Sequence, residues 1–215
     1  MSAGSRDIID ILAAIEPGSS LDGIRARRSQ ARENAQKSYL ALFEPVDFGD
    51  VAGAERHAVA AFVAGVHDEP SVTAFYMAKL GKAAGQPELI EALKAEIERG
   101  KTEGPYSAFP TGPLSAEDKG GLIYRVAKDR KPFIGVKLAA ALEHAHLLVF
   151  HPRDASAAAI QALLDAGWSS TATVTLSQLV AFLSFQVRSV VGLRTLGASL
   201  GRHVDPAATE LTNHG

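Results

Sequence analysis

Apolar side chains recur along most of the chain at the three- and four-residue spacing of an amphipathic helix. The first stripe consists of Ile8, Ile11, Leu12 and Ile15, and Pro17-Gly18 predicts where that helix ends. The same pattern predicts further helices over 21–43, 54–66, 70–85, 87–99, 115–126, 131–150, 156–167 and 170–200. Almost no segment shows the two-residue alternation of a strand, so the pattern predicts an all-α fold class.

Local signals place some of the helix starts. Pro70 suits the first turn of a helix and forces Glu69 towards an extended conformation. Ser115 and Asp118 form a capping-box-like start for the predicted helix 115–126. The stretch 100–112 carries little pattern and two prolines, so we expect a surface loop there, and it is where a lid is expected.

Three parts are expected along the chain. Residues 1–50 form an N-terminal helical extension packed on the core, 51–200 form the main helical domain, and 201–215 form a polar, frayed tail. A total of 215 residues suits one large domain with an extension and is a poor fit to two full domains.

Composition is that of a globular protein, with 47% hydrophobic and 21% charged residues. The 22 basic and 24 acidic residues give a net charge of −2, which disfavours nucleic acid and anionic membranes as partners. Arg25, Arg27, Arg28 and Arg32 are a local exception. No aromatic residues alternate with these arginines, so a solvated helix face or a subunit contact is the favoured interpretation.

Location and redox chemistry follow from what the sequence lacks. The first ten residues show no secretory signal pattern, and the apolar segment 174–187 is interrupted by Ser177, Gln178 and Ser184, which favours a buried helix over a membrane span. A cytoplasmic location is therefore expected. The absence of cysteine excludes disulfides and thiolate metal sites, and no metal or cofactor motif is found.

The stretches Arg56 to Ala64 and Ala157 to Leu193 resemble parts of the carboxymuconolactone decarboxylase/AhpD-like superfamily. The first is similar to the helix of that family that leads into a CxxCxxxH motif. The stretch Ala157 to Leu193 is similar to its closing helix pair, with Gly167-Trp168-Ser169 at the turn and Gln186-Val187-Arg188 near the end. The segments IDILAAIEPGSSLDGIRARR and SYLALF further resemble a cysteine-free branch of this superfamily. The resemblance implies an AhpD-like multi-helix domain.

The reactive residues of the family are missing at the matching positions. The resemblance places the relay glutamate at His57, the two cysteines at Glu69 and Val72, and the histidine at Tyr76; in a register shifted by one residue, Glu55 would be the acid. Thiol peroxidase chemistry needs a thiolate nucleophile and a resolving thiol, and neither glutamate nor valine can supply one. The sequence therefore excludes that activity.

Other chemistry is conceivable at the same place. If the resemblance holds, His57, His67, Glu69 and Tyr76 would lie together as the catalytic candidates, since a histidine beside a carboxylate can act as a general acid/base pair. The alternative is structural, with Glu69 at a helix start and His67 in a loop. Arg188, in an otherwise apolar helix, needs a carboxylate such as Glu55 or Glu143, or a bound anion; Glu55 and Arg188 are the substrate-binding candidates.

Two further histidines lie in the apolar predicted helix 131–150. His144 and His146 project about 200° apart around a helix, so they cannot share one metal ion. They are expected to be core histidines with hydrogen-bond partners, or interface residues.

Two functions remain open. One is a cofactorless acid/base enzyme that isomerises or decarboxylates a lactone or keto acid. The other is a non-catalytic relative that binds a small molecule, or a partner such as a cysteine-bearing sister protein. In both cases the apolar excess of 131–150 and 174–200 predicts a homo-oligomer.

Overall fold

The computed structural model describes residues 6–202, and their regular structure is helical. The helices are α1 Ile8–Leu12, α2 Ser20–Ala26, α3 Ser29–Phe43, α4 Gly53–Val66, α5 Pro70–Ala84, α6 Pro87–Gly100, α7 Lys131–Ile134, α8 Val136–Phe150, α9 Ala157–Asp165 and α10 Ser170–Arg202, with the 3-10 turns η1 Pro113–Glu117 and η2 Pro152–Asp154. Within 6–202 the β-type pairing is one isolated bridge between Ser107 and Lys119. The all-α prediction is confirmed.

Several predicted helix ends are confirmed together with their physical cause. Proline occupies the first position of both α5 and α6, where its missing N–H is not needed for a hydrogen bond within the helix. Glu69, before Pro70, is extended at φ −110° and ψ 89°. Gly85 ends α5 in the left-handed conformation at φ +61°, which favours glycine.

The predicted helix over 115–126 is wrong. Only the short turn η1 forms there, and the chain is then irregular up to residue 127. Gly121 lies against the ring of Tyr106, so that a Cβ at this position would meet ring carbons at 2.3–2.4 Å. The Tyr106 hydroxyl also donates to the Leu122 carbonyl at 2.6 Å. Packing of the chain on an aromatic ring therefore replaces the helix that the capping signal predicts.

Two other predicted helices are each split in two. The segment 131–150 divides into α7 and α8 at Gly135, whose φ of +81° is not a helical value. The segment 21–43 divides into α2 and α3 at Arg27-Arg28. In both cases the periodicity predicts the helical segments correctly, but it does not reveal that one or two residues interrupt the helix.

Contacts divide the chain into two compact units. Within the described residues, the first unit holds 6–39 and 188–202, and the second holds Leu40–Val187. These bounds differ from the predicted parts, because the end of α10 groups with the N-terminal helices and not with the main domain. The predicted frayed tail 201–215 lies outside the described residues, apart from the last two positions of α10.

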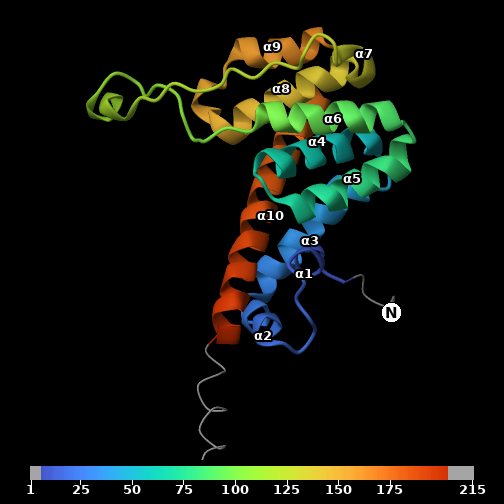
Figure 1. Cartoon of the computed structure of the whole chain (residues 1–215), viewed down its shortest axis with the longest axis vertical. Helices are drawn as coiled ribbons and strands as arrows, with labels where there is room; N and C mark the ends of the chain where they lie inside the picture. The colour runs from blue at the N-terminus through green and yellow to red at the C-terminus, as the bar shows by residue number, and fades with distance from the viewer. Residues whose placement is uncertain (1–5, 203–215) are drawn as a thin grey trace, which may run out of the picture. The chain divides into compact units, whose positions relative to one another are not determined.

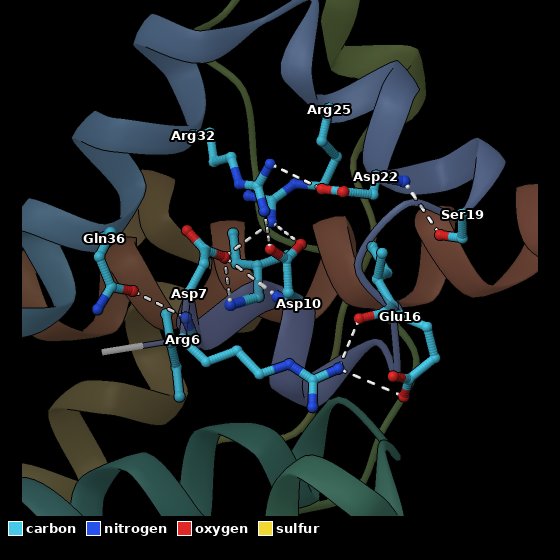
Figure 2. A network of polar contacts seen from close by, with 12 residues as sticks. Arg6, Asp7, Asp10, Glu16, Ser19, Asp22, Arg25, Arg32 and Gln36 are labelled. Carbon is cyan, nitrogen blue, oxygen red and sulfur yellow. Dashed lines mark hydrogen bonds and ion pairs between the residues drawn. The ribbon is translucent and has the colours of Figure 1, made fainter. Parts of the chain in front are cut away.

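The first unit is organised by an ion-pair network between its short helices (Figure 2). Arg25, which is 8% exposed, pairs with Asp7 at 2.7 Å and also with Asp10. Arg32 pairs with Asp10 and, at 2.9 Å, with Asp22. Arg25 is therefore buried and neutralised inside the unit, and the half-buried Arg32 is neutralised with it. Of the four arginines, only Arg27 and Arg28 are exposed, as the predicted solvated face requires.

The second unit is built around α4, which contacts α5, α6 and α8 (Figure 1). Every residue from 58 to 66 is buried, as expected for a helix with neighbours on several faces. Gly65 permits a close approach of α6, because a Cβ there would meet Ile97 at 2.5 Å. The loop between α6 and α7 extends away from the helices and carries η1 at its far end (Figure 1).

The start of α4 is fixed by a buried arginine. Arg56 is 5% exposed and donates to the carbonyls of Leu42, Phe48 and Val51 at 2.6, 2.7 and 2.9 Å. Burial lowers the pKa of this guanidinium. The hydrogen bonds hold the connector 44–52 against α4, and they fix the backbone at the neighbouring candidate His57.

Helix α10 is the longest element. By length and composition alone its segment Ser170–Leu200 could cross a membrane, with a mean hydropathy of 1.4 over its most apolar window. Within the structure 44% of that window is buried. Core helices of soluble proteins pass the same test, so a single helix of this kind is weak support for a membrane span.

Candidate functional site

His57 and Tyr76, two of the four catalytic candidates, lie together in the second unit. Their ring centroids are 6.4 Å apart, and both rings stack against Phe43, at 5.4 Å for His57 and 5.1 Å for Tyr76. The three residues come from α4, α5 and the end of α3. This aromatic cluster matches the expectation that His57 and Tyr76 would be neighbours.

The environment of His57 keeps its imidazole neutral. Burial, together with the positive charge of Lys79, lowers the pKa of His57 from 6.5 to about 4. Its Nδ1 is buried and has no hydrogen-bond partner within 6–202. A histidine with so low a pKa is a weak proton acceptor near neutral pH, where a general base works best with a pKa close to the working pH.

The Tyr76 hydroxyl is committed to a buried hydrogen bond. It donates to Oε1 of Gln186 on α10 at 2.6 Å, and both side chains are fully buried. The Nε2 atom of Gln186 finds no partner among the described residues. Gln186 belongs to the Gln-x-Arg stretch behind the family resemblance, but the sequence does not reveal that it reaches Tyr76.

The other two catalytic candidates lie at a different place. His67 is the C-cap of α4, ten residues beyond His57, which corresponds to about 15 Å along a helix. Its Nε2 lies 3.3 Å from the Ser184 hydroxyl. Glu69 precedes α5 and accepts a hydrogen bond from the Ser71 hydroxyl at 2.8 Å. The structure therefore separates the four residues into two pairs, and His57 is not brought to Glu69.

Glu55 has a structural role at the start of α4. One of its carboxylate oxygens accepts from the Ala52 amide at 2.8 Å, and the other pairs with Lys137 of α8 at 3.1 Å. Lys137 also lies over the Trp168 ring at 4.0 Å, while the Trp168 indole donates to the Lys137 carbonyl at 2.7 Å. The carboxylate thus caps α4 and ties it to α8.

Arg188, the other predicted substrate-binding residue, belongs to the first unit and is exposed. No carboxylate pairs with it among the described side chains. Glu143, one of its expected partners, instead accepts from the Val126 amide at 3.1 Å and contacts Arg125 at 3.5 Å. Exposure removes the need for a partner that the sequence suggests for an arginine in an apolar helix.

A cleft of about 580 Å³ opens where α4 ends and α5 begins, beside α6. Its volume falls in the range of small-molecule sites. Most of the lining surface is apolar, and the apolar or small residues are Gly65, Pro70, Thr73, Ala74, Met77 and Ile97. The charged residues are Asp68, Glu69, Lys94, Glu98 and Lys101.

The charged residues of this cleft are partly paired with one another. Lys101 bridges Asp68 at 3.0 Å and Glu98 at 2.9 Å. Lys94 pairs with Glu91, outside the cleft lining, at 2.8 Å. The cleft thus has an apolar interior with charges of both signs at its border.

His144 and His146 are buried, as expected for core histidines. Nε2 of His144 lies 3.1 Å from the Ser177 hydroxyl, and Nε2 of His146 lies 3.0 Å from the Gly100 carbonyl. Burial lowers the pKa of both, that of His146 to about 4. In the described part of the chain, no group of three or more potential ligands is placed to hold a metal ion.

The sequence interpretation missed one fully buried carboxylate. Glu96 of α6 accepts from the Tyr124 hydroxyl at 2.7 Å, from Arg99 at 2.7 Å and from the Ala127 amide at 3.3 Å. Burial, and then the hydrogen bond to the negatively charged Glu96, raise the pKa of Tyr124. The contacts of Glu96 hold the long loop before α7 to α6, and in the sequence Glu96 looks like any glutamate of an amphipathic helix.

Comparison of this chain with protein-family models, with curated proteins and with solved structures finds no match. The candidate site therefore stands on its own geometry.

Proposed function

We propose that this chain is a cysteine-free member of the carboxymuconolactone decarboxylase/AhpD-like superfamily that binds a small molecule in the cleft between α4, α5 and α6. One observation carries the proposal. The position that the resemblance assigns to the first cysteine is Glu69, which lines the cleft, and the position of the second is Val72, three residues later in α5, which is fully buried. A cleft thus lies at the position that the resemblance assigns to the first cysteine, and this coincidence supports the proposal.

The geometry favours binding over the acid/base reaction. A neutral His57 with a pKa near 4 is about three units from the optimum of a general base at pH 7, and it lies roughly 15 Å from the region of Glu69. Tyr76 already donates its proton to Gln186. The residues expected to move protons are therefore separated or committed to structural hydrogen bonds.

The cleft suits a molecule with an apolar body and a polar end. Burial of apolar surface contributes about 25 cal/mol per Å² removed from water, so the apolar lining supplies the affinity. The border charges would select the polar end, since an unmatched buried charge is costly. Charges of both signs lie at the border of the cleft, so two probes of opposite charge identify the preferred end group.

The test uses the neutral fluorescent probe N-phenyl-1-naphthylamine and two exposed alanines of α5. Ala74 lines the cleft, whereas Ala78 lies one turn further on and outside the lining. Ala74→Trp fills the cleft and is expected to weaken probe binding at least tenfold, while Ala78→Trp leaves binding unchanged. Competition by octanoate and by octylamine then ranks the two end groups. Equal binding by wild type and Ala74→Trp would refute the proposed site.

Self-association is part of the proposal. Large apolar side chains are exposed on α7 to α10, among them Phe133 at 52%, Val136 at 67% and Val174 at 57%. Such residues are typical of surfaces that become buried between subunits. We expect a homo-oligomer in the cytoplasm, and sedimentation at micromolar concentration tests it. Co-purification of a cysteine-bearing chain would instead support the sister-protein alternative.

A further inference from the structure

A second pocket lies in the second unit, between the long loop after α6 and the end of α8. It has a volume of about 370 Å³, and its lining includes Tyr106, Ser107, Gly120, Gly121, His151 and Asp154. Tyr106 organises it, because its ring stacks on the His151 ring at 5.1 Å while Gly121 lies against the Tyr106 ring. The histidine ring is thus held in one orientation by aromatic packing.

His151 and Asp154 form a hydrogen-bonded dyad. Nδ1 of His151 lies 3.0 Å from Oδ2 of Asp154, across the turn η2. A carboxylate at this nitrogen holds the ring proton on Nδ1, which leaves the lone pair on Nε2. Among the ion pairs of the described residues, this is the one between a histidine and a carboxylate.

The second ring nitrogen of His151 is free of hydrogen bonds and is not fully buried. No partner within 6–202 reaches its Nε2, and this atom keeps some solvent contact although the residue is only 8% exposed, whereas the unpartnered Nδ1 atoms of His57, His144 and His146 are buried. His151 therefore combines a packed ring, a carboxylate on one nitrogen and an unpaired lone pair on the other. The remaining core histidines lack this combination.

Two backbone amides complete the arrangement. Gly120 and Gly121 line the same pocket, and neither amide donates a hydrogen bond to another residue in the described chain. Both glycines are exposed, and unengaged amides in the pocket that holds a base are donors for an oxyanion that develops there. Ser107 lies there as well, at the strained φ of +140°, but its hydroxyl accepts from Arg153 Nε at 2.9 Å and makes no hydrogen bond to His151.

We propose that the Asp154–His151 dyad is a general-base site that hydrolyses small acyl esters bound in this pocket. His151 Nε2 takes a proton from water as the water oxygen bonds to the acyl carbon. The carbon–oxygen bond to the leaving alcohol then breaks, and the imidazolium returns the proton to that alcohol. One ester and one water give one acid and one alcohol. Water is the nucleophile because the Ser107 hydroxyl makes no hydrogen bond to His151, so the base cannot take its proton directly.

Asp154→Asn tests the dyad with little risk to folding, because the Asp154 side chain is 48% exposed. With p-nitrophenyl acetate as the probe, kcat/KM is expected to fall on the order of 10²-fold, the lower end of what a general base contributes. Asp165→Asn, which removes an exposed carboxylate at the end of α9, is the control and leaves kcat/KM unchanged. Equal rates for wild type and Asp154→Asn, or a wild-type rate no faster than buffer, would overturn the proposal.

A second readout separates catalysis from a structural role. The ¹⁵N resonances of His151 should report the proton on Nδ1 in the wild type and a mixture of tautomers in Asp154→Asn, while the amide spectrum stays otherwise native. A stable acyl adduct on Ser107 in the intact mass would contradict water as the nucleophile. This site is separate from the α4–α5–α6 cleft, so Ala74→Trp should leave ester hydrolysis unchanged.

Discussion

Gly65→Ala is the substitution that tests the packing beneath the cleft most sharply. Gly65 lies in α4, and a Cβ there would meet three side-chain atoms of Ile97 in α6, Cγ2 at 2.5 Å, Cδ1 at 2.9 Å and Cγ1 at 3.0 Å. The Cδ1 atom can rotate away. Cγ2 cannot, because it is attached to Cβ and the χ1 angle of isoleucine is restricted in a helix.

The expected magnitude follows from two opposing terms. Overpacking a core position costs about 1–3 kcal/mol. Replacing glycine by alanine inside a helix returns about 0.5–1 kcal/mol. The net prediction is a destabilisation of about 1 kcal/mol or somewhat more, with a cleft altered at its base because Gly65 and Ile97 both line it.

Urea unfolding followed by far-UV circular dichroism measures the effect. Gly81→Ala in α5 is the matched control, because its Cβ would meet only Ile90 Cδ1 at an ordinary 3.6 Å. The control should therefore be stabilised by about 0.5–1 kcal/mol through helix propensity alone. A Gly65→Ala protein as stable as Gly81→Ala would refute the close α4–α6 contact.

Two further predictions concern charge. Arg25→Met removes the arginine that pairs with the buried Asp7 and Asp10 carboxylates in Figure 2, so the free energy of unfolding of the first unit should fall by about 3–5 kcal/mol. Amide hydrogen exchange over 6–39 should accelerate while exchange in α4 stays the same. Replacing the exposed Arg28 by Met should change neither the unfolding free energy nor the exchange rates. Burial lowers the pKa of His57 and of His146 from the ordinary 6.5 to about 4 in the folded chain, so the unfolded chain binds more protons between these pH values. The contribution of the two histidines to stability is complete above pH 6.5 and is lost as the pH falls towards 4. The urea midpoint should therefore drop between pH 7.5 and 5.5, and an unchanged midpoint would contradict the buried, neutral state of these histidines.

Periodicity and proline placement suffice for most of the fold. The starts of α5 and α6 follow from Pro70 and Pro87. For α9 the sequence offers Asp154 or Ser156 as the N-cap, and in the structure it is the Ser156 hydroxyl that accepts from the Ala159 amide, at 3.3 Å. Short-range rules fail where distant residues decide the backbone. The loop after α6 is shaped by contacts of Tyr106 with Gly121 and His151, and no local pattern encodes these contacts.

The site is less accessible to sequence reasoning than the fold. The resemblance places His57 and Tyr76 together, and the structure has them in one cluster. The resemblance does not reveal that burial lowers the pKa of His57, because this burial depends on Phe43 and on α5. The His151–Asp154 spacing of three residues is visible in the sequence, but only the turn η2 brings the two side chains together.

The central claim is that the α4–α5–α6 cleft binds a small molecule through its apolar body, and methyl NMR during a titration with N-phenyl-1-naphthylamine tests it directly. The methyl signals of Ala74, Met77 and Ile97 should shift in a saturable manner, while that of Ile123 at the second pocket stays in place. Absence of shifts at these three methyls, or shifts confined to residues outside the cleft, would contradict the account.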